Sequence, residues 1–165
     1  MSTDKIFRYC KTLLVAFIAI MSWIIVIGNV TDYYTNYHFV EHVFKMDTTF
    51  PDSHVHYRSI DNEFIYHLGY ILIILSEGIM GWFCLSGSIA MYRQLKNAAG
   101  FHQSKSKAVI GIMIGIAVWF FGFEVIGGEW FAMWQSSTWN GLASAERIVS
   151  FLVLSMILLQ MKEEE

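Results

Sequence analysis

Two glutamates fall inside stretches of the chain that are otherwise apolar enough to cross a bilayer. Glu77 lies within the stretch 64–92, about 16 Å of helix beyond Tyr66, which places it near the middle of a membrane. Glu124 lies toward one end of the stretch 108–126. An ionisable side chain at such depth costs at least about 2.5–3 kcal/mol on insertion scales, so we expect both to face the interior of a helix bundle.

Glu77 has two interpretations. It is either a carboxylate that carries a proton or binds a ligand, or a structural acid that bonds to a backbone carbonyl, Ser22 or Ser155. At helical spacing it shares a stripe with small and polar residues, which are Tyr66, Tyr70, Gly81, Cys84 and Ser88. Such a stripe should face protein rather than lipid.

At the same end of the predicted bundle as Glu124 lie Glu129 and Arg147. Arg147 opens the last apolar stretch, so the sequence predicts an ion pair between Arg147 and Glu124 or Glu129. A substrate site built from the same three residues is the alternative.

The segment 127–145 carries Trp130, Trp134 and Trp139, with glycines on both sides and polar residues between. Tryptophan is enriched at membrane interfaces, which explains part of this pattern. The glycines indicate a folded cap, and the three tryptophans are candidate binding residues.

Two histidines, His38 and His42, are one helical turn apart and could share a metal ion, with Glu41 or Asp47 nearby. The alternative is that they are ordinary loop histidines. This spacing lacks the specificity of a zinc-protease motif, and the chain has no P-loop, Rossmann fingerprint or nucleophile elbow. We therefore expect no catalytic residue, no cofactor and no enzyme activity.

The composition predicts a membrane protein. The 165 residues are 55% apolar and only 15% charged, against about 25% charged in soluble domains. This argues against a nucleic-acid binder. We predict an all-α membrane protein, with four transmembrane helices forming a bundle in one domain, 1–165, and a structured outer cap. The predicted spans are about 13–30, 64–92, 108–126 and 146–161, and the outer loops are about 31–63 and 127–145.

The glycines of the third span bear on how the helices pack. Gly111 and Gly115 are four residues apart, which lets a neighbouring helix approach closely. This spacing favours packing inside the bundle, and a homo-oligomer interface is the alternative.

The basic residues predict the orientation. The N-terminal tail and the loop 93–107 carry Lys5, Arg8, Lys11, Arg93, Lys96, Lys105 and Lys107, and that loop contains no acid. Because basic loops stay in the cytoplasm, we expect both termini to be cytoplasmic.

Two segments carry a family resemblance: HVFKMDTTF at 42–50 and GGEWFAMWQSSTWNG at 127–141. With these segments, nearly the whole chain resembles the bacterial family of predicted small integral membrane proteins called domain of unknown function 2165. The resemblance implies a four-span protein of the bacterial inner membrane. It carries no agreed activity, so it transfers no catalytic residue.

Three functions remain open from the sequence. The favoured hypothesis is a non-enzymatic scaffold or accessory component whose aromatic cap contacts lipid, a membrane-protein partner or a second copy. The alternative is a small transporter or ligand-binding membrane protein that uses Glu77 and Glu124. The third is an outward-facing metalloenzyme or an accessory subunit of a respiratory complex.

Overall fold

The computed structural model describes residues 3–162, and all of their regular structure is helical. The long elements are α1 (Thr3–Thr31), α2 (Tyr33–Lys45), α3 (Glu63–Arg93), α4 (Ala98–Ser104), α5 (Ser106–Ile116), the π-helix η2 (Ala117–Trp130) and α6 (Leu142–Gln160). Two short 3-10 turns, η1 (His56–Arg58) and η3 (Met133–Gln135), lie in the connections. Four helical rods are long and apolar enough to span a membrane, namely Thr3–Thr31, Glu63–Arg93, Ala98–Trp130 and Leu142–Gln160.

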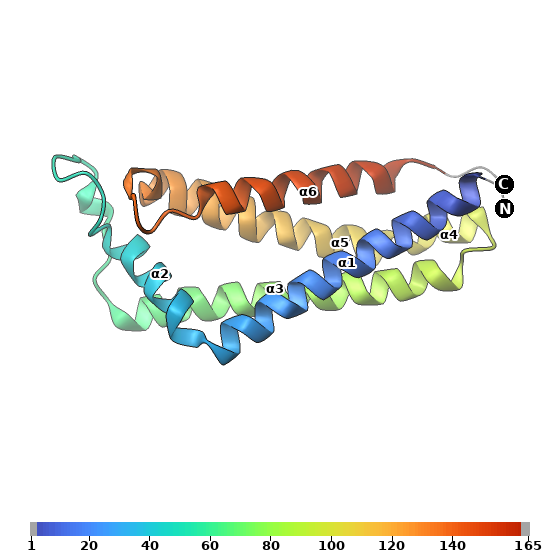
Figure 1. Ribbon diagram of the computed structural model, residues 1–165, viewed down its shortest axis with the longest axis horizontal. Helices are drawn as coiled ribbons and strands as arrows, with labels where there is room; N and C mark the ends of the chain where they lie inside the picture. Colours follow the sequence, from blue (N-terminus) through green and yellow to red (C-terminus); the bar gives the residue numbers. More distant parts are fainter. Residues whose placement is uncertain (1–2, 163–165) are drawn as a thin grey trace.

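The rods form an elongated bundle in which α3 is central. It packs most extensively against α1 and α5, while α6 lies along η2 and α5. The two ends of the described chain lie together at one end of the bundle, beside α4 (Figure 1). We call this the terminal end. The opposite end carries the segments 32–62 and 131–141, which together we call the cap.

The chain buries its apolar core along the bundle axis and leaves many large apolar residues exposed. Val15, Met80 and Leu152 are among the fully buried core residues. Exposed on the outside of the spans are Phe17, Ile24, Trp82 and Leu154, each at 60% or more of its surface. A surface of this kind is stable only against lipid or another apolar partner.

Close packing between α3 and α5 depends on glycines. A Cβ added to Gly87 would lie 2.5 Å from the backbone nitrogen of Ala108, and one at Gly111 would lie 2.9 Å from the backbone nitrogen of Cys84. A Cβ at Gly115 would meet the sulfur of Met80 at 2.8 Å. Gly111 and Gly115 therefore lie inside the bundle, which was the favoured interpretation of their spacing.

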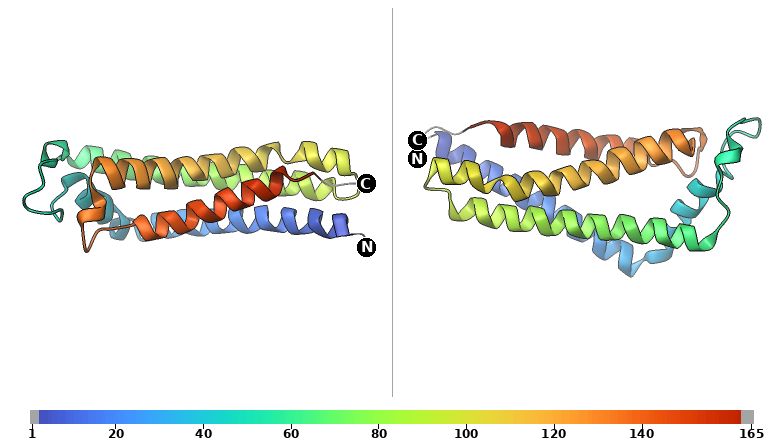
Figure 2. Two further views of the ribbon diagram at one scale, coloured as in Figure 1. Left: turned by 90° about the horizontal axis from the view of Figure 1, so that it is seen from above. Right: turned by 180° about the vertical axis from the view of Figure 1, so that it is seen from behind.

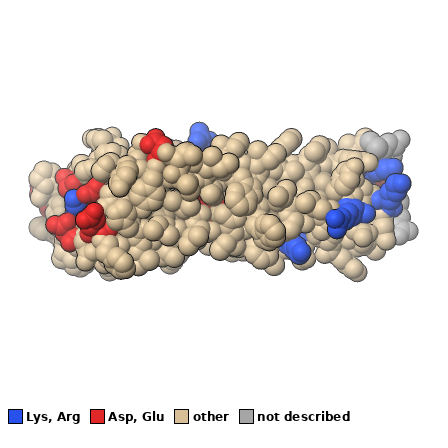
Figure 3. All heavy atoms as spheres, turned by 90° about the horizontal axis from the view of Figure 1, so that it is seen from below, with Lys and Arg blue, Asp and Glu red and all other residues tan. Residues whose placement is uncertain are grey.

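Charges separate along the long axis, as the space-filling view shows. Lys and Arg gather toward the terminal end and most Asp and Glu toward the cap (Figure 3). The terminal end also buries basic side chains: Arg8 donates to the carbonyl of Leu95 over 3.0 Å, and Lys11 to that of Met161 over 2.6 Å. These contacts extend α1 ten residues before the predicted start of the first span at 13.

Candidate functional site

Glu77 lies in the middle of α3, with only 2% of its surface exposed. The side-chain amide of Asn29, on α1, donates to Glu77 Oε2 over 2.9 Å. Asn29 Oδ1 in turn accepts a 2.7 Å hydrogen bond from the amide of Asn36, on α2. A chain of three polar side chains therefore runs from the bundle centre to the cap.

The hydrogen-bond partner of the carboxylate differs from the predicted ones. Ser22 Oγ donates over 2.5 Å to the backbone carbonyl of Glu77 rather than to its carboxylate. Ser155 bonds its own helix at the carbonyl of Phe151. Asn29 was missed because it ends the first apolar stretch and looks like a helix terminus. No sequence signal marked it, because only the structure shows that α1 continues past it to Thr31.

A cavity of about 220 Å³ adjoins Glu77, between α1, α2, α3, η2 and α6. It is partly open, and its walls are mostly apolar. The lining residues are Ile25, Asn29, Asn36, Phe39, Val40, Tyr70, Ile73, Glu77, Trp119, Phe123, Gly141 and Ser144. The hydroxyl of Tyr70 donates to the backbone carbonyl of Asn29 over 3.2 Å. None of the lining residues is Lys, Arg or His.

A second cavity of about 80 Å³ adjoins the first on the side of the cap. The two share Phe39, Val40, Ile73 and Phe123 as wall residues. The second is lined only by apolar side chains and glycines. The combined space therefore has a polar floor at Glu77 and an apolar extension.

Aromatic residues of α2 pack against α3 beside the first cavity. Tyr33 bonds His67 over 2.7 Å, and the ring of Tyr37 stacks on His67 with centroids 4.3 Å apart. Burial is the main cause that raises the pKa of both Tyr33 and Tyr37, so both hydroxyls are neutral at physiological pH. These contacts fix α2 over the bundle.

Glu124 lies apart from Glu77 and does not line the cavity. One carboxylate oxygen, Oε1, is buried and has no hydrogen-bond partner among residues 3–162. The predicted ion pair with Arg147 is wrong: Arg147 and Glu129 are exposed, and within the described chain no salt bridge joins Arg147 to Glu124 or Glu129. Placement at the same end of the bundle, on which the prediction rested, does not by itself bring these side chains into contact.

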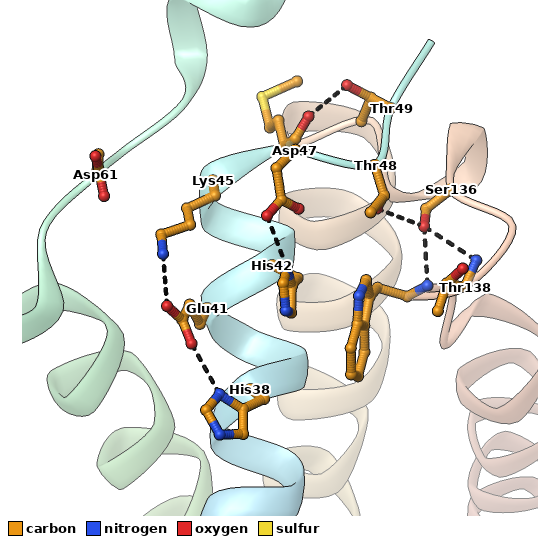
Figure 4. Close-up of polar contacts among 12 residues, drawn as sticks. His38, Glu41, His42, Lys45, Asp47, Thr48, Thr49, Asp61, Ser136 and Thr138 are labelled. Atoms are coloured by element: carbon orange, nitrogen blue, oxygen red, sulfur yellow. Dashed lines mark hydrogen bonds and ion pairs between the residues drawn. The ribbon is translucent and has the colours of Figure 1, made fainter.

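The two histidines proposed as metal ligands bond to different acids (Figure 4). His38 Nδ1 lies 2.9 Å from Glu41 Oε2, and His42 Nδ1 lies 2.7 Å from Asp47 Oδ2. Across the described residues, no group of three or more His, Cys, Asp or Glu side chains is placed to hold a metal ion. The first of these contacts lies within α2, and the second joins α2 to the turn after it.

The three predicted cap tryptophans have different surroundings. Trp139 stacks on His42, with ring centroids 4.6 Å apart and planes 9° from parallel. Trp130 is half exposed and lies under the guanidinium of Arg58, and Trp134 is half exposed and contacts Phe50 edge to face. None of the three lines the Glu77 cavity, whose tryptophan is Trp119.

Ser136 joins the two segments of the cap. Its Oγ lies 2.7 Å from Thr48 Oγ1 and accepts from the backbone nitrogens of Thr138 and Trp139 (Figure 4). Residues 131–141 are thereby attached to the turn after α2.

A family model described as "Predicted small integral membrane protein (DUF2165)" matches residues 7–162. No curated protein matches the chain, and no solved structure matches it. The family match covers both cap segments, three of the four membrane rods in full and the first rod from residue 7. This chain therefore belongs to the family of predicted small integral membrane proteins called domain of unknown function 2165.

Proposed function

We propose that this protein is a non-enzymatic membrane protein that binds a small ligand in the Glu77 cavity. The observation that carries the proposal is a buried carboxylate, with one side-chain donor, beside a cavity with apolar walls. An apolar pocket with a few convergent polar groups is the usual form of a small-molecule site. An acid with a purely structural role needs no such space beside it.

The size of the cavity sets the size of the ligand. Its volume of about 220 Å³ is below the range of about 300–1,000 Å³ that holds drug-sized molecules. It exceeds the engineered cavity of about 150 Å³ that binds benzene. The ligand is therefore about as large as a substituted benzene.

Entry from the side fits the arrangement of the helices. Ile25 of α1 and Ser144 of α6 both line the cavity. The two helices make few contacts and diverge toward the cap end in the view of Figure 1 and in its reverse, the right view of Figure 2. A ligand dissolved in the membrane would pass between them.

The neutral probe 2-phenylethanol tests this proposal by calorimetry on protein in nanodiscs, with empty nanodiscs as the reference for partitioning. Ser144→Phe places a ring at the cavity wall, whereas Ser150→Phe places the same ring on an exposed position of α6 outside the cavity. We expect wild type and Ser150→Phe to bind, and Ser144→Phe to lose tenfold or more in affinity. Absence of binding to wild type, or equal binding to both variants, would overturn the proposal.

A scaffold or accessory role is the second candidate, and the exposed aromatic residues of the cap favour it. Phe50, Trp130 and Trp134 are 50–53% exposed and lie on the cap. A photoreactive residue at position 134 tests this role in native membranes. A discrete protein adduct, either a dimer or one defined partner, supports it, and adducts with lipid alone reject it.

We further propose that the protein lies in a bacterial inner membrane with the terminal end in the cytoplasm. The separation of charge along the bundle supports this orientation (Figure 3). The cap then faces the periplasm.

A further inference from the structure

We infer that the ligand of the Glu77 cavity is an organic cation, a protonated or quaternary amine on a small apolar body. This inference rests on the ligand-binding function proposed above. It adds the charge of the ligand, which follows from what surrounds the carboxylate.

The carboxylate has no cationic partner in the cavity. Among residues 3–162 its one side-chain partner is the neutral amide of Asn29, and the other polar side-chain groups of the wall are the amide of Asn36, the hydroxyls of Tyr70 and Ser144 and the indole N–H of Trp119. A buried charge without a counter-charge is unstable in an apolar environment. Glu77 therefore holds either a proton or a cation, and an anionic ligand would find no counter-charge among the residues that line the cavity.

The surrounding elements supply no other group that would titrate near neutral pH. The groups that face Glu77 or line the cavity are Ser22, Ile25 and Asn29 on α1, Asn36, Phe39 and Val40 on α2, Tyr70 and Ile73 on α3, Trp119 and Phe123 on η2, and Gly141 and Ser144 at the start of α6. Only Tyr70 among them is titratable, and a phenol is neutral at physiological pH. When a cation binds, one proton leaves the Glu77 carboxyl group for solvent, so proton and ligand compete.

Aromatic walls favour an organic cation over a metal ion. Trp119 and Phe123 stack with centroids 4.7 Å apart, and Phe39 lies 6.2 Å from Phe123. Aromatic faces attract ammonium groups, including quaternary amines. Calcium and magnesium instead require about six oxygen ligands, whereas the residues that line this cavity include only one carboxylate.

The adjoining apolar cavity accommodates the body of the ligand. Its walls include Val43, Phe44, Ile126 and Met133. With the ammonium group at Glu77, the apolar body would extend toward the cap. This arrangement places each part of the ligand against a wall of matching polarity.

Three probes with a common phenyl ring and different charge separate the cation inference from ligand binding in general. They are 2-phenylethylammonium, 2-phenylethanol and phenylacetate, measured by calorimetry on the full chain in nanodiscs at pH 7.5. We expect the ammonium ion to bind at least tenfold more tightly than the alcohol, and phenylacetate to show no binding. We also expect the affinity for the ammonium ion to fall as the pH is lowered to 5, while that for the alcohol stays constant.

Glu77→Gln should abolish the preference for the cation and its pH dependence while retaining the alcohol, because the glutamine oxygen can still accept from Asn29. Glu77→Asp keeps a carboxylate and should retain the preference for the cation. Binding by this variant tests the inference even where Glu77→Gln folds poorly. Glu124→Gln is the matched control, because Glu124 lies on a spanning helix but outside the cavity. It should leave all three affinities unchanged.

The outcomes distinguish the two proposals. If none of the probes binds wild type, the ligand-binding function itself is rejected. If the alcohol binds and the ammonium ion binds no more tightly, or if Glu77→Gln keeps the cation preference, only the assignment of a cation is rejected.

Discussion

The side-chain amide of Asn29 donates a 2.9 Å hydrogen bond to the carboxylate of Glu77, across the interface of α1 and α3. Both residues are buried, Asn29 at 7% and Glu77 at 2% exposure. Because Asn29 also accepts from Asn36 on α2, one amide links three helices. The side chain of Asn29 thus connects the cap to the buried carboxylate at the bundle centre.

Replacing Asn29 by Ala should destabilise the fold by about 1–3 kcal/mol, since it leaves the buried carboxylate without its donor. Asn36→Ala should cost less, because Asn36 is exposed and water can replace it. Thermal unfolding in detergent measures both. Equal destabilisation by the two variants would contradict the prediction.

The glycines of α3 should respond oppositely to alanine. Gly87→Ala should destabilise strongly, because its Cβ would lie 2.5 Å from the backbone of Ala108. Gly78→Ala, with nothing within 4 Å of the new Cβ, should stabilise by up to about 1 kcal/mol through helix propensity. Unfolding midpoints of the pair decide this, and a stable Gly87→Ala would refute close α3–α5 packing.

The Glu41–Lys45 pair makes the stability of α2 depend on pH. The hydrogen bond from Lys45, followed by that from His38, lowers the pKa of Glu41 below its usual 4.5. The same carboxylate raises the pKa of Lys45 above its usual 10.5. A lowered acid pKa gives stability that is present above 4.5 and lost as the pH falls through the folded value. The raised lysine pKa gives stability that is present below 10.5 and lost as the pH rises through the folded value.

The protection factors of the α2 amides, which are corrected for the intrinsic pH dependence of exchange, should therefore be highest between these limits and fall on either side. Lys45→Met should remove the loss of protection at alkaline pH and reduce the loss of protection at acid pH. Lys107→Met, at the other end of the bundle, serves as the control. A pH profile for Lys45→Met that matches wild type would argue against the pair.

Ser136→Ala should loosen the cap, because Ser136 Oγ bonds to Thr48 Oγ1 and accepts hydrogen bonds from two backbone nitrogens. The expected loss is about 1–3 kcal/mol of local stability. Ser137→Ala changes an exposed neighbour and should have little effect. Protease cleavage within residues 46–62 reports on the cap, and equal cleavage of the two variants would count against this role.

Cysteine labelling tests the orientation. In a background with Cys10→Ser and Cys84→Ala, Asp52→Cys should react with a membrane-impermeant maleimide on intact spheroplasts. Gln103→Cys should react only after permeabilisation. Both positions are exposed, so reactivity reports the side of the membrane. The reverse pattern would invert the proposed topology.

Four membrane helices were predictable because a span needs a long apolar stretch, and the four-helix, all-α fold is confirmed. Hydropathy detects only the apolar part of each rod. It therefore misses the first ten residues of α1, where Arg8 and Lys11 are buried by donating to carbonyls.

The site was only partly predictable. Glu77 stands out by its type and depth, but the cavity depends on how far α1 and α6 diverge, which no residue spacing encodes. Trp119 therefore gave no signal. Glu124 was assigned to an ion pair with Arg147 because both lie at the cap end, and this shared position does not bring the two side chains into contact.

Lys11 donates to the carbonyl of Met161, a residue 150 positions later in the chain, and Lys105 donates to the carbonyls of Leu159 and Met161. These carbonyls are at the C-terminal end of α6, where helix carbonyls lack intrahelical donors. The first rod thus meets this acceptor only after ribosomal synthesis has reached the last residues. A nascent chain stopped before residue 161 therefore lacks this closure.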